Sequence, residues 1–123
     1  LGEVLVETGF RLATDPDTVL APDVSFISSA RIPATGLPEG YFPGAPDLAI
    51  EIVSPDDLDE EVQAKVAASL QSGSKLVWVL RPKRRTVTVH HPDGTERTLG
   101  VNDTLSGESL LPDFSLPLRE LFS

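Results

Sequence analysis

The chain has 123 residues, of which 40% are hydrophobic, and carries a formal net charge of −9 at pH 7. This size suits one domain, and neither an apolar stretch of the roughly 20 residues that span a membrane nor a signal peptide is visible, so we expect a cytoplasmic protein. The acidic charge argues against a protein that coats nucleic acid, because phosphate binding depends on Lys and Arg. It is compatible with a nuclease, since a carboxylate metal site is itself acidic.

The first part of the chain predicts two strands, over residues 3–12 and 19–27. The Asp-Pro-Asp turn signal at 15–17 indicates a hairpin between them. A connection rich in proline and glycine follows at 28–46, and loops of that length are uncommon in compact domains and often functional.

The stretch 48–53, Leu-Ala-Ile-Glu-Ile-Val, has the length and composition of a buried strand that Glu51 interrupts. Side chains alternate along a strand, so Glu51 shares a face with Ala49 and Val53. A carboxylate there is costly unless it is paired, neutralised or bound to a cation. We therefore expect Glu51 to be functional, with a simple buried ion pair as the alternative.

A helix is predicted over 57–72, with Ser54 or Asp56 as its cap and Gly73 as its end. Lys65 borders the apolar face of this helix, so its long stem can carry the ammonium to a site at the sheet. The alternative is a surface lysine at the helix flank. The apolar stripe recurs every four positions, at Leu58, Val62, Val66 and Leu70.

The second half of the chain predicts strands at 75–80, 86–91 and 96–99. A basic turn at 81–85 separates the first two of these strands and is either a solvated hairpin tip or a contact for a phosphate backbone. From residue 101 we expect a loop whose apolar side chains seal one edge of the sheet, and then a short helix. This order predicts an α/β (α+β) protein with a mixed sheet covered on at least one face.

Asp23 and Glu51 lie on predicted strands that can be neighbours. Two converging carboxylates make a hard-oxygen site that suits Mg²⁺ or Mn²⁺, and a nearby lysine such as Lys65 can orient a water or stabilise developing negative charge. The alternative for Asp23 is a strand-start residue that accepts backbone N–H bonds. Asp47 is a weaker candidate, roughly 13 Å along the strand from Glu51, and is interpreted as structural.

Several spaced elements resemble, in the same order, the Uma-type putative restriction endonuclease family of the PD-(D/E)XK nuclease-like superfamily. The resemblance covers the whole chain and implies a restriction-endonuclease-like, αβββαβ-type core with a metal-dependent phosphodiesterase site. The elements that carry it are Pro22-Asp23, the stretch 46–55, Lys65, Gly73, Trp78 and the closing residues 110–122.

The resemblance assigns Asp23 and Glu51 to the two motif carboxylates. The superfamily lysine often follows the second carboxylate by two positions, where Val53 stands here, and the family supplies it from the following helix as Lys65. The helix also carries Leu70 where relatives tend to have an aromatic residue. Family members begin with a further segment that includes a helix, so we expect the N-terminal helix to be missing.

The predicted function is that of an endonuclease that uses Mg²⁺ or Mn²⁺ to hydrolyse DNA phosphodiester bonds. A homodimer is compatible with cutting both strands of a duplex. One alternative is a catalytically inactive nuclease-fold module for binding or assembly, and another is a hydrolase of a different phosphoester.

Overall fold

The computed structural model describes residues 2–6, 10–14, 17–20, 22–32 and 42–123. These residues form a β-rich α+β fold with one long helix, as the sequence predicts. The strands are β1 (Gly2–Val6), β2 (Phe10–Thr14), β3 (Asp17–Leu20), β4 (Val24–Ser28), β5 (Phe42–Pro43), β6 (Leu48–Ile52), β7 (Leu76–Arg81), β8 (Thr86–His90), β9 (Glu96–Leu99), β10 (Thr104–Gly107) and β11 (Leu111–Pro117). The helices are η1 (Ser29–Arg31, 3₁₀), α1 (Asp59–Gln71) and α2 (Leu118–Leu121).

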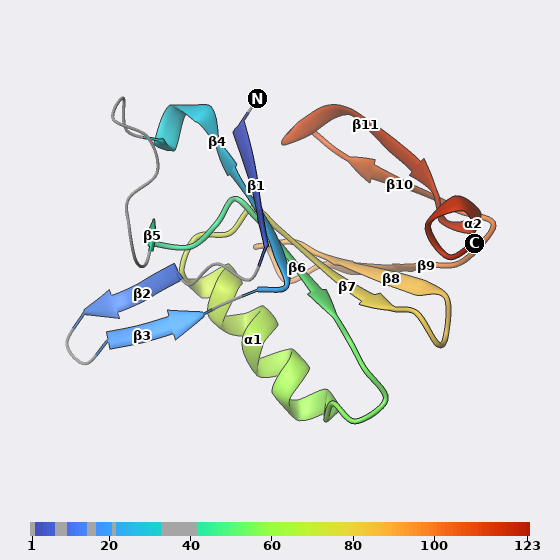
Figure 1. Ribbon diagram of the computed structural model, residues 1–123, viewed down its shortest axis with the longest axis horizontal. Coiled ribbons are helices and arrows are strands. Elements are labelled where there is room, and N and C mark those ends of the chain that lie inside the picture. Colours follow the sequence, from blue (N-terminus) through green and yellow to red (C-terminus); the bar gives the residue numbers. More distant parts are fainter. Residues whose placement is uncertain (1, 7–9, 15–16, 21, 33–41) are drawn as a thin grey trace.

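The main sheet has the strand order β1-β4-β6-β7-β8-β9 (Figure 1). Strands β6 and β7 are parallel, and every other pair in this sheet is antiparallel. Helix α1 provides the crossover that a parallel pair requires. The predicted mixed sheet is therefore confirmed, and its parallel pair places α1 against the strand that carries Glu51.

The first two predicted strands are each divided in the structure. Strand β1 pairs with β4 in the main sheet, whereas β2 pairs with β3 in a separate small sheet that also contains β5. Pro22, which has no N–H to donate to a ladder, lies between β3 and β4. The hairpin expected from the sequence is therefore confirmed in its antiparallel pairing, but its inner and outer segments belong to two different sheets.

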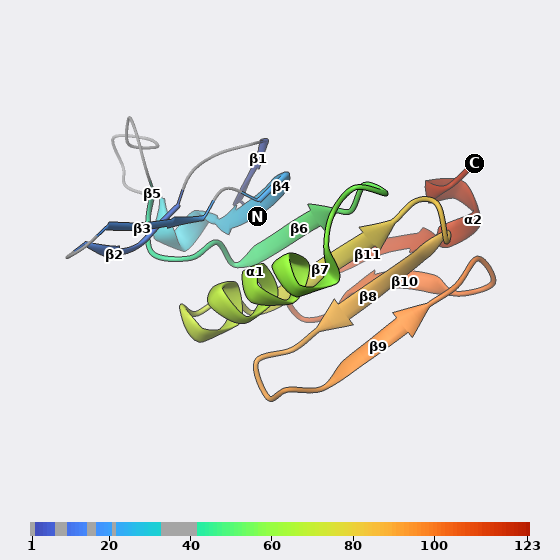
Figure 2. The same cartoon turned by 90° about the horizontal axis from the view of Figure 1, so that it is seen from below.

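The two faces of the main sheet are covered by different parts of the chain. Helix α1 packs Val62 and Val66 onto the face that contains Ala49, Val77 and Val79. The opposite face carries Trp78 and is covered by β10, β11 and α2, as Figures 1 and 2 show. The core is therefore split into two layers by the sheet.

The segment after residue 101 is not the expected loop but a β10–β11 ribbon followed by α2. The ribbon covers a face of the sheet, and its Phe114 ring lies with its centroid 5.5 Å from that of Trp78. Gly107 permits the close approach of the two ribbon strands, because a Cβ at that position would overlap with Leu111. The sequence signal was weak because the register shifts between Ser106 and Gly107, which breaks the alternation.

Helix α1 begins at Asp59 rather than at residue 57, and neither Ser54 nor Asp56 caps it. Residues 54–57 instead form a turn in which the Asp57 carboxylate accepts a hydrogen bond from the Ser54 N–H at 2.9 Å. Leu58 is 61% exposed, so the apolar stripe starts one turn later than expected. Gly73 follows the helix with φ +114°, as a C-terminal stop requires.

Candidate active site

Asp23 directly precedes β4, which is antiparallel to β6 with Val24 opposite Ile50. Its Oδ2 atom accepts a hydrogen bond of 2.7 Å from the Ile52 N–H. The alternative reading of Asp23, as an acceptor of backbone N–H groups, is therefore correct for one of its two oxygens. The same bond holds the carboxyl group beside β6, on which Glu51 lies.

Glu51 lies on the α1 face of β6, and only 5% of the residue is exposed. Its Oε1 atom is buried and has no hydrogen-bond partner among the described residues. Burial raises its pKa from 4.5 to about 7; Lys65 lowers that pKa, and Asp23 and Asp57 raise it further. Within the described part of the chain no basic group forms an ion pair with Glu51, so the described residues give no support to the buried-ion-pair alternative.

Lys65 extends from the side of α1 next to the buried Val66. Its side chain is exposed, yet it lines a polar cavity of about 150 Å³ together with Asp23 and Glu51. The three candidates chosen from the sequence therefore meet in one cavity. In the described structure the Lys65 ammonium forms no ion pair within 4.0 Å of either carboxylate, which leaves space between the charged groups.

Two further acids line the same cavity and were not chosen from the sequence, Asp57 and Glu61. The acidic run at 56–61 had the pattern of a solvated helix start. One signal was available: Glu61 and Lys65 are four positions apart, so they lie on the same side of α1. Of the two acids, Asp57 adds negative potential that raises the pKa of Glu51.

The carboxylates of Asp23 and Glu51 are suitable ligands for a hard divalent cation, although they are only two. In the described ranges no group of three or more His, Cys, Asp or Glu side chains is placed to hold a metal ion. Mg²⁺ is commonly bound through one or two carboxylates and keeps several waters, so Asp23 and Glu51 alone meet that requirement. The unpartnered Glu51 oxygen is the donor that such an ion would use.

Asp47 lies outside this cavity and is structural, as interpreted from the sequence. It is 2% exposed, and its Oδ2 atom accepts a 2.7 Å hydrogen bond from the Ser28 N–H. Its Oδ1 atom lies 3.3 Å from Arg31 Nη1 and 3.9 Å from Lys75 Nζ. The carboxylate thus ties the end of β4 to the starts of β6 and β7.

The sheet with its crossover helix and the acidic cavity between them define a protein with a nuclease-like fold. The chain matches the model of the Uma2 family, described as "Putative restriction endonuclease", over residues 1–119, and it belongs to that family. The resemblance noted in the sequence is thereby confirmed.

A solved structure supports the same fold. It is the crystal structure of a protein from Anabaena variabilis titled as a putative nuclease belonging to DUF820, with a TM-score of 0.87 and 26% sequence identity. The match covers 98% of this chain and 68% of that one. A comparison with curated proteins found no match. No helix in the described residues has the length and apolar character needed to cross a membrane.

Proposed function

We propose that this protein is an endonuclease that hydrolyses DNA phosphodiester bonds with Mg²⁺ or Mn²⁺. The observation that carries the proposal is the buried carboxylate of Glu51, which has an unpartnered oxygen and shares a cavity with Asp23 and Lys65. A fold that only needed stability would place an apolar residue at this position, because an unpaired buried carboxylate is unfavourable.

Asp23 and Glu51 are the residues that would hold the metal. Asp23 is kept in place by the Ile52 N–H, and Glu51 is fixed by the strand it belongs to. When bound, a divalent ion would polarise a phosphoryl oxygen and lower the pKa of a water. Glu51 must lose its proton to act as a ligand, so its pKa of about 7 predicts that the site becomes competent as the pH rises through neutrality.

Lys65 supplies the positive charge of the cavity. Its ammonium is close enough to lower the pKa of Glu51 without forming an ion pair with it. We assign to it the orientation of the attacking water and the stabilisation of negative charge that develops on the phosphate, a role for which a fixed cation is effective.

Plasmid nicking in the presence of Mn²⁺ tests this function. The purified protein is expected to nick supercoiled DNA, and Glu51→Ala is expected to reduce the rate by at least about 100-fold. Glu60→Ala is the matched control, because Glu60 is exposed and does not line the cavity. Equal nicking by Glu51→Ala and the control would refute the assignment.

A second candidate is a nuclease-fold module that binds or assembles without turnover. It is favoured by the observation that, in the described ranges, no three His, Cys, Asp or Glu side chains are placed to hold a metal ion together. The nicking assay distinguishes the two functions when Mn²⁺ binding is measured in parallel by calorimetry. A protein that binds Mn²⁺ but does not nick DNA supports the inactive module. Sedimentation of the protein with DNA would show whether a homodimer forms.

A further inference from the structure

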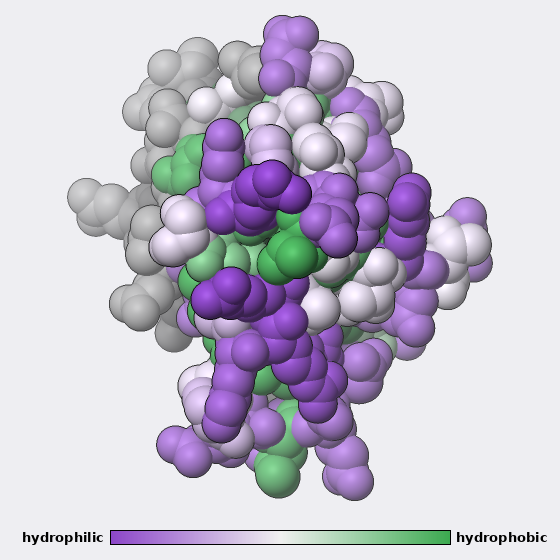
Figure 3. Space-filling view, turned by 90° about the vertical axis from the view of Figure 1, so that its right-hand side faces the viewer, coloured by the Kyte–Doolittle hydropathy of each residue, from purple (hydrophilic) through white to green (hydrophobic). Residues whose placement is uncertain are grey.

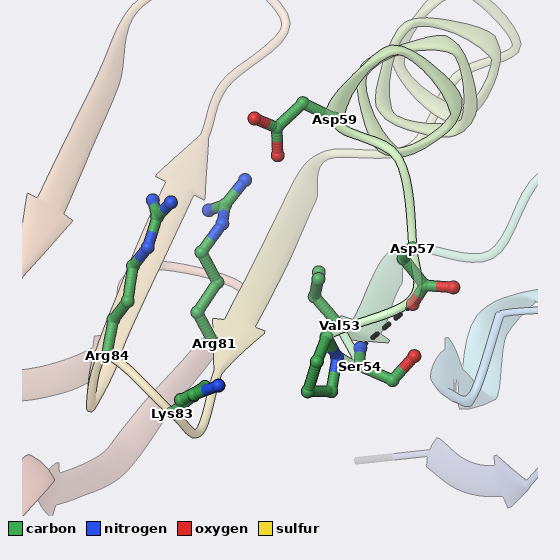
Figure 4. Close-up of a pocket in the computed structure, with 8 residues that line it drawn as sticks. Val53, Ser54, Asp57, Asp59, Arg81, Lys83 and Arg84 are labelled. Atoms are coloured by element: carbon green, nitrogen blue, oxygen red, sulfur yellow. Dashed lines mark hydrogen bonds between the residues drawn. The ribbon is translucent and has the colours of Figure 1, made fainter.

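A second cavity, of about 240 Å³, is drawn in Figure 4 and shares lining residues with the acidic one. One wall is the segment between β6 and α1, and the other is the β7–β8 turn with Arg81, Lys83 and Arg84. We call this cavity the basic groove. Figure 3 shows the side of the molecule toward which the turn projects, and hydrophilic residues cover most of it.

The basic groove and the acidic cavity are neighbours because they share Val53 and Asp57. The Val53 N–H donates to the Leu80 carbonyl at 2.9 Å, which fixes the shared wall to β7. Arg81 lies two residues beyond the register partner of Glu51 on β7, so their Cα atoms are roughly 8 Å apart. A nucleic acid strand that reaches the acidic cavity would therefore pass the basic groove.

Two of the three cations of the groove, Lys83 and Arg84, are available for a ligand, whereas Arg81 donates a hydrogen bond of 3.3 Å to the Thr88 hydroxyl. Among the residues that the structure describes, Lys83 and Arg84 form no ion pair, and both are exposed. The turn concentrates four of the ten Lys and Arg residues of an acidic chain within residues 81–85. Local positive charge of this kind is what a phosphate backbone requires in a protein whose net charge repels it.

The turn is also held in one conformation. The Arg84 N–H donates to the Arg81 carbonyl at 3.1 Å, and the Arg85 N–H to the Pro82 carbonyl at 3.2 Å. Arg85 has φ +57°, a left-handed conformation in which glycine or asparagine is usual. The chain thus keeps a basic residue where backbone preference would favour another, and it presents these cations on a defined scaffold.

Two acids, Asp57 and Asp59, also line the groove and affect how well it can bind an anion. The Asp57 carboxylate accepts a hydrogen bond from the Ser54 N–H and does not point at the cations of the β7–β8 turn (Figure 4). Asp59 stands across the groove from Arg81 and opposes the binding of an anion. Removal of the Asp59 charge should therefore tighten binding of a phosphate in the groove, a gain that partial unfolding cannot mimic.

We propose that the basic groove binds a backbone phosphate of the DNA strand next to the phosphate at Asp23 and Glu51. Lys83 and Arg84 are then positioning residues, which set the register of the strand. This inference rests on the proposed DNA substrate and adds the path that the substrate takes.

The test is fluorescence anisotropy of a labelled DNA duplex at several salt concentrations, with EDTA present to prevent cleavage. Lys83→Ala/Arg84→Ala is expected to weaken binding by at least about tenfold and to reduce the slope of log K against log salt by about 2. The matched control is Arg97→Ala/Arg119→Ala, which removes the same charge from exposed positions outside the groove. It should change the affinity by less than about twofold. Asp59→Asn should tighten binding.

Equal effects of the two double variants would overturn the proposal, because net charge alone would then explain them. Failure of Asp59→Asn to tighten binding, or failure of the unaltered protein to bind the duplex, would also overturn it. The nicking assay separates this inference from the proposed function. If Lys83→Ala/Arg84→Ala weakens binding but the unaltered protein does not nick DNA, only the proposed nuclease activity is contradicted. If the protein nicks DNA and the two double variants bind it equally well, only the role of the groove is contradicted.

Discussion

Replacement of Glu51 by Gln is expected to stabilise the metal-free protein above neutral pH. Burial favours the protonated carboxyl, so the pKa of Glu51 is about 7 in the folded chain and 4.5 in the reference state. Between these values the folded state holds a proton that the unfolded state has released. Stability from this group is therefore complete below pH 4.5 and is lost as the pH rises through 7.

The size of the effect follows from the two pKa values. At about 1.4 kcal/mol for each factor of ten in proton affinity, ionisation of Glu51 reduces the free energy of unfolding by about 3 kcal/mol at pH 8. Gln has nearly the same shape and stays neutral, so Glu51→Gln avoids this loss. For a domain of this size the difference corresponds to a melting temperature roughly 10 °C higher at pH 8, and to almost no difference at pH 4.

Urea unfolding of both proteins in EDTA, followed by circular dichroism from pH 4 to 9, measures this difference. Glu60→Gln is the control, because Glu60 is exposed and its replacement should leave the pH profile unchanged. Added Mn²⁺ should then stabilise the unaltered protein and not Glu51→Gln. A Glu51→Gln protein that is no more stable at pH 8 would refute the reasoning, since it would mean that the ionised carboxylate is already compensated.

Other side chains give predictions of different kinds. Asp47→Ala should lower the free energy of unfolding by about 3 kcal/mol in urea, because it leaves the partly buried Ser28 N–H without its acceptor and removes the carboxylate beside Arg31 and Lys75; a loss below about 1 kcal/mol would contradict its structural role. Lys65→Ala should move the rising limb of the pH–nicking profile to higher pH, since Lys65 lowers the pKa of Glu51, and an unmoved limb would count against it. Gly107→Ala should destabilise the ribbon by about 2 kcal/mol, and an unchanged melting temperature would show that the strands can separate.

The central part of the fold could be predicted from local patterns. The β6 run and the alternation in β8 reflect strands within the main sheet, and the apolar period of α1 reflects a helix that packs against it. The β10–β11 ribbon could not, because its register shift and the tight contact at Gly107 depend on tertiary packing. The division of the first strands was missed for a related reason: β1 and β2 join different sheets, and only the pairing partners decide that.

The candidate site was predicted in outline because it contains a residue type that conflicts with its surroundings. A carboxylate in a buried strand identified Glu51, and the neighbouring strand and helix gave Asp23 and Lys65. Asp57 could not be recognised, because its place in the cavity follows from the 54–57 turn, which sequence reasoning assigned to the helix start. The basic groove depends on the parallel pairing of β6 and β7, which places the 81–85 turn beside residues 54–57.

The most direct test of the account is the position of a bound cation. Crystals of the protein grown with Mn²⁺ above pH 8 and measured at the manganese absorption edge should give an anomalous peak at about 2.2 Å from one oxygen of Asp23 and one of Glu51. A peak bound to other side chains, or none in a crystal whose Glu51 carboxylate is accessible, would contradict the claim that this buried acid exists to hold a metal.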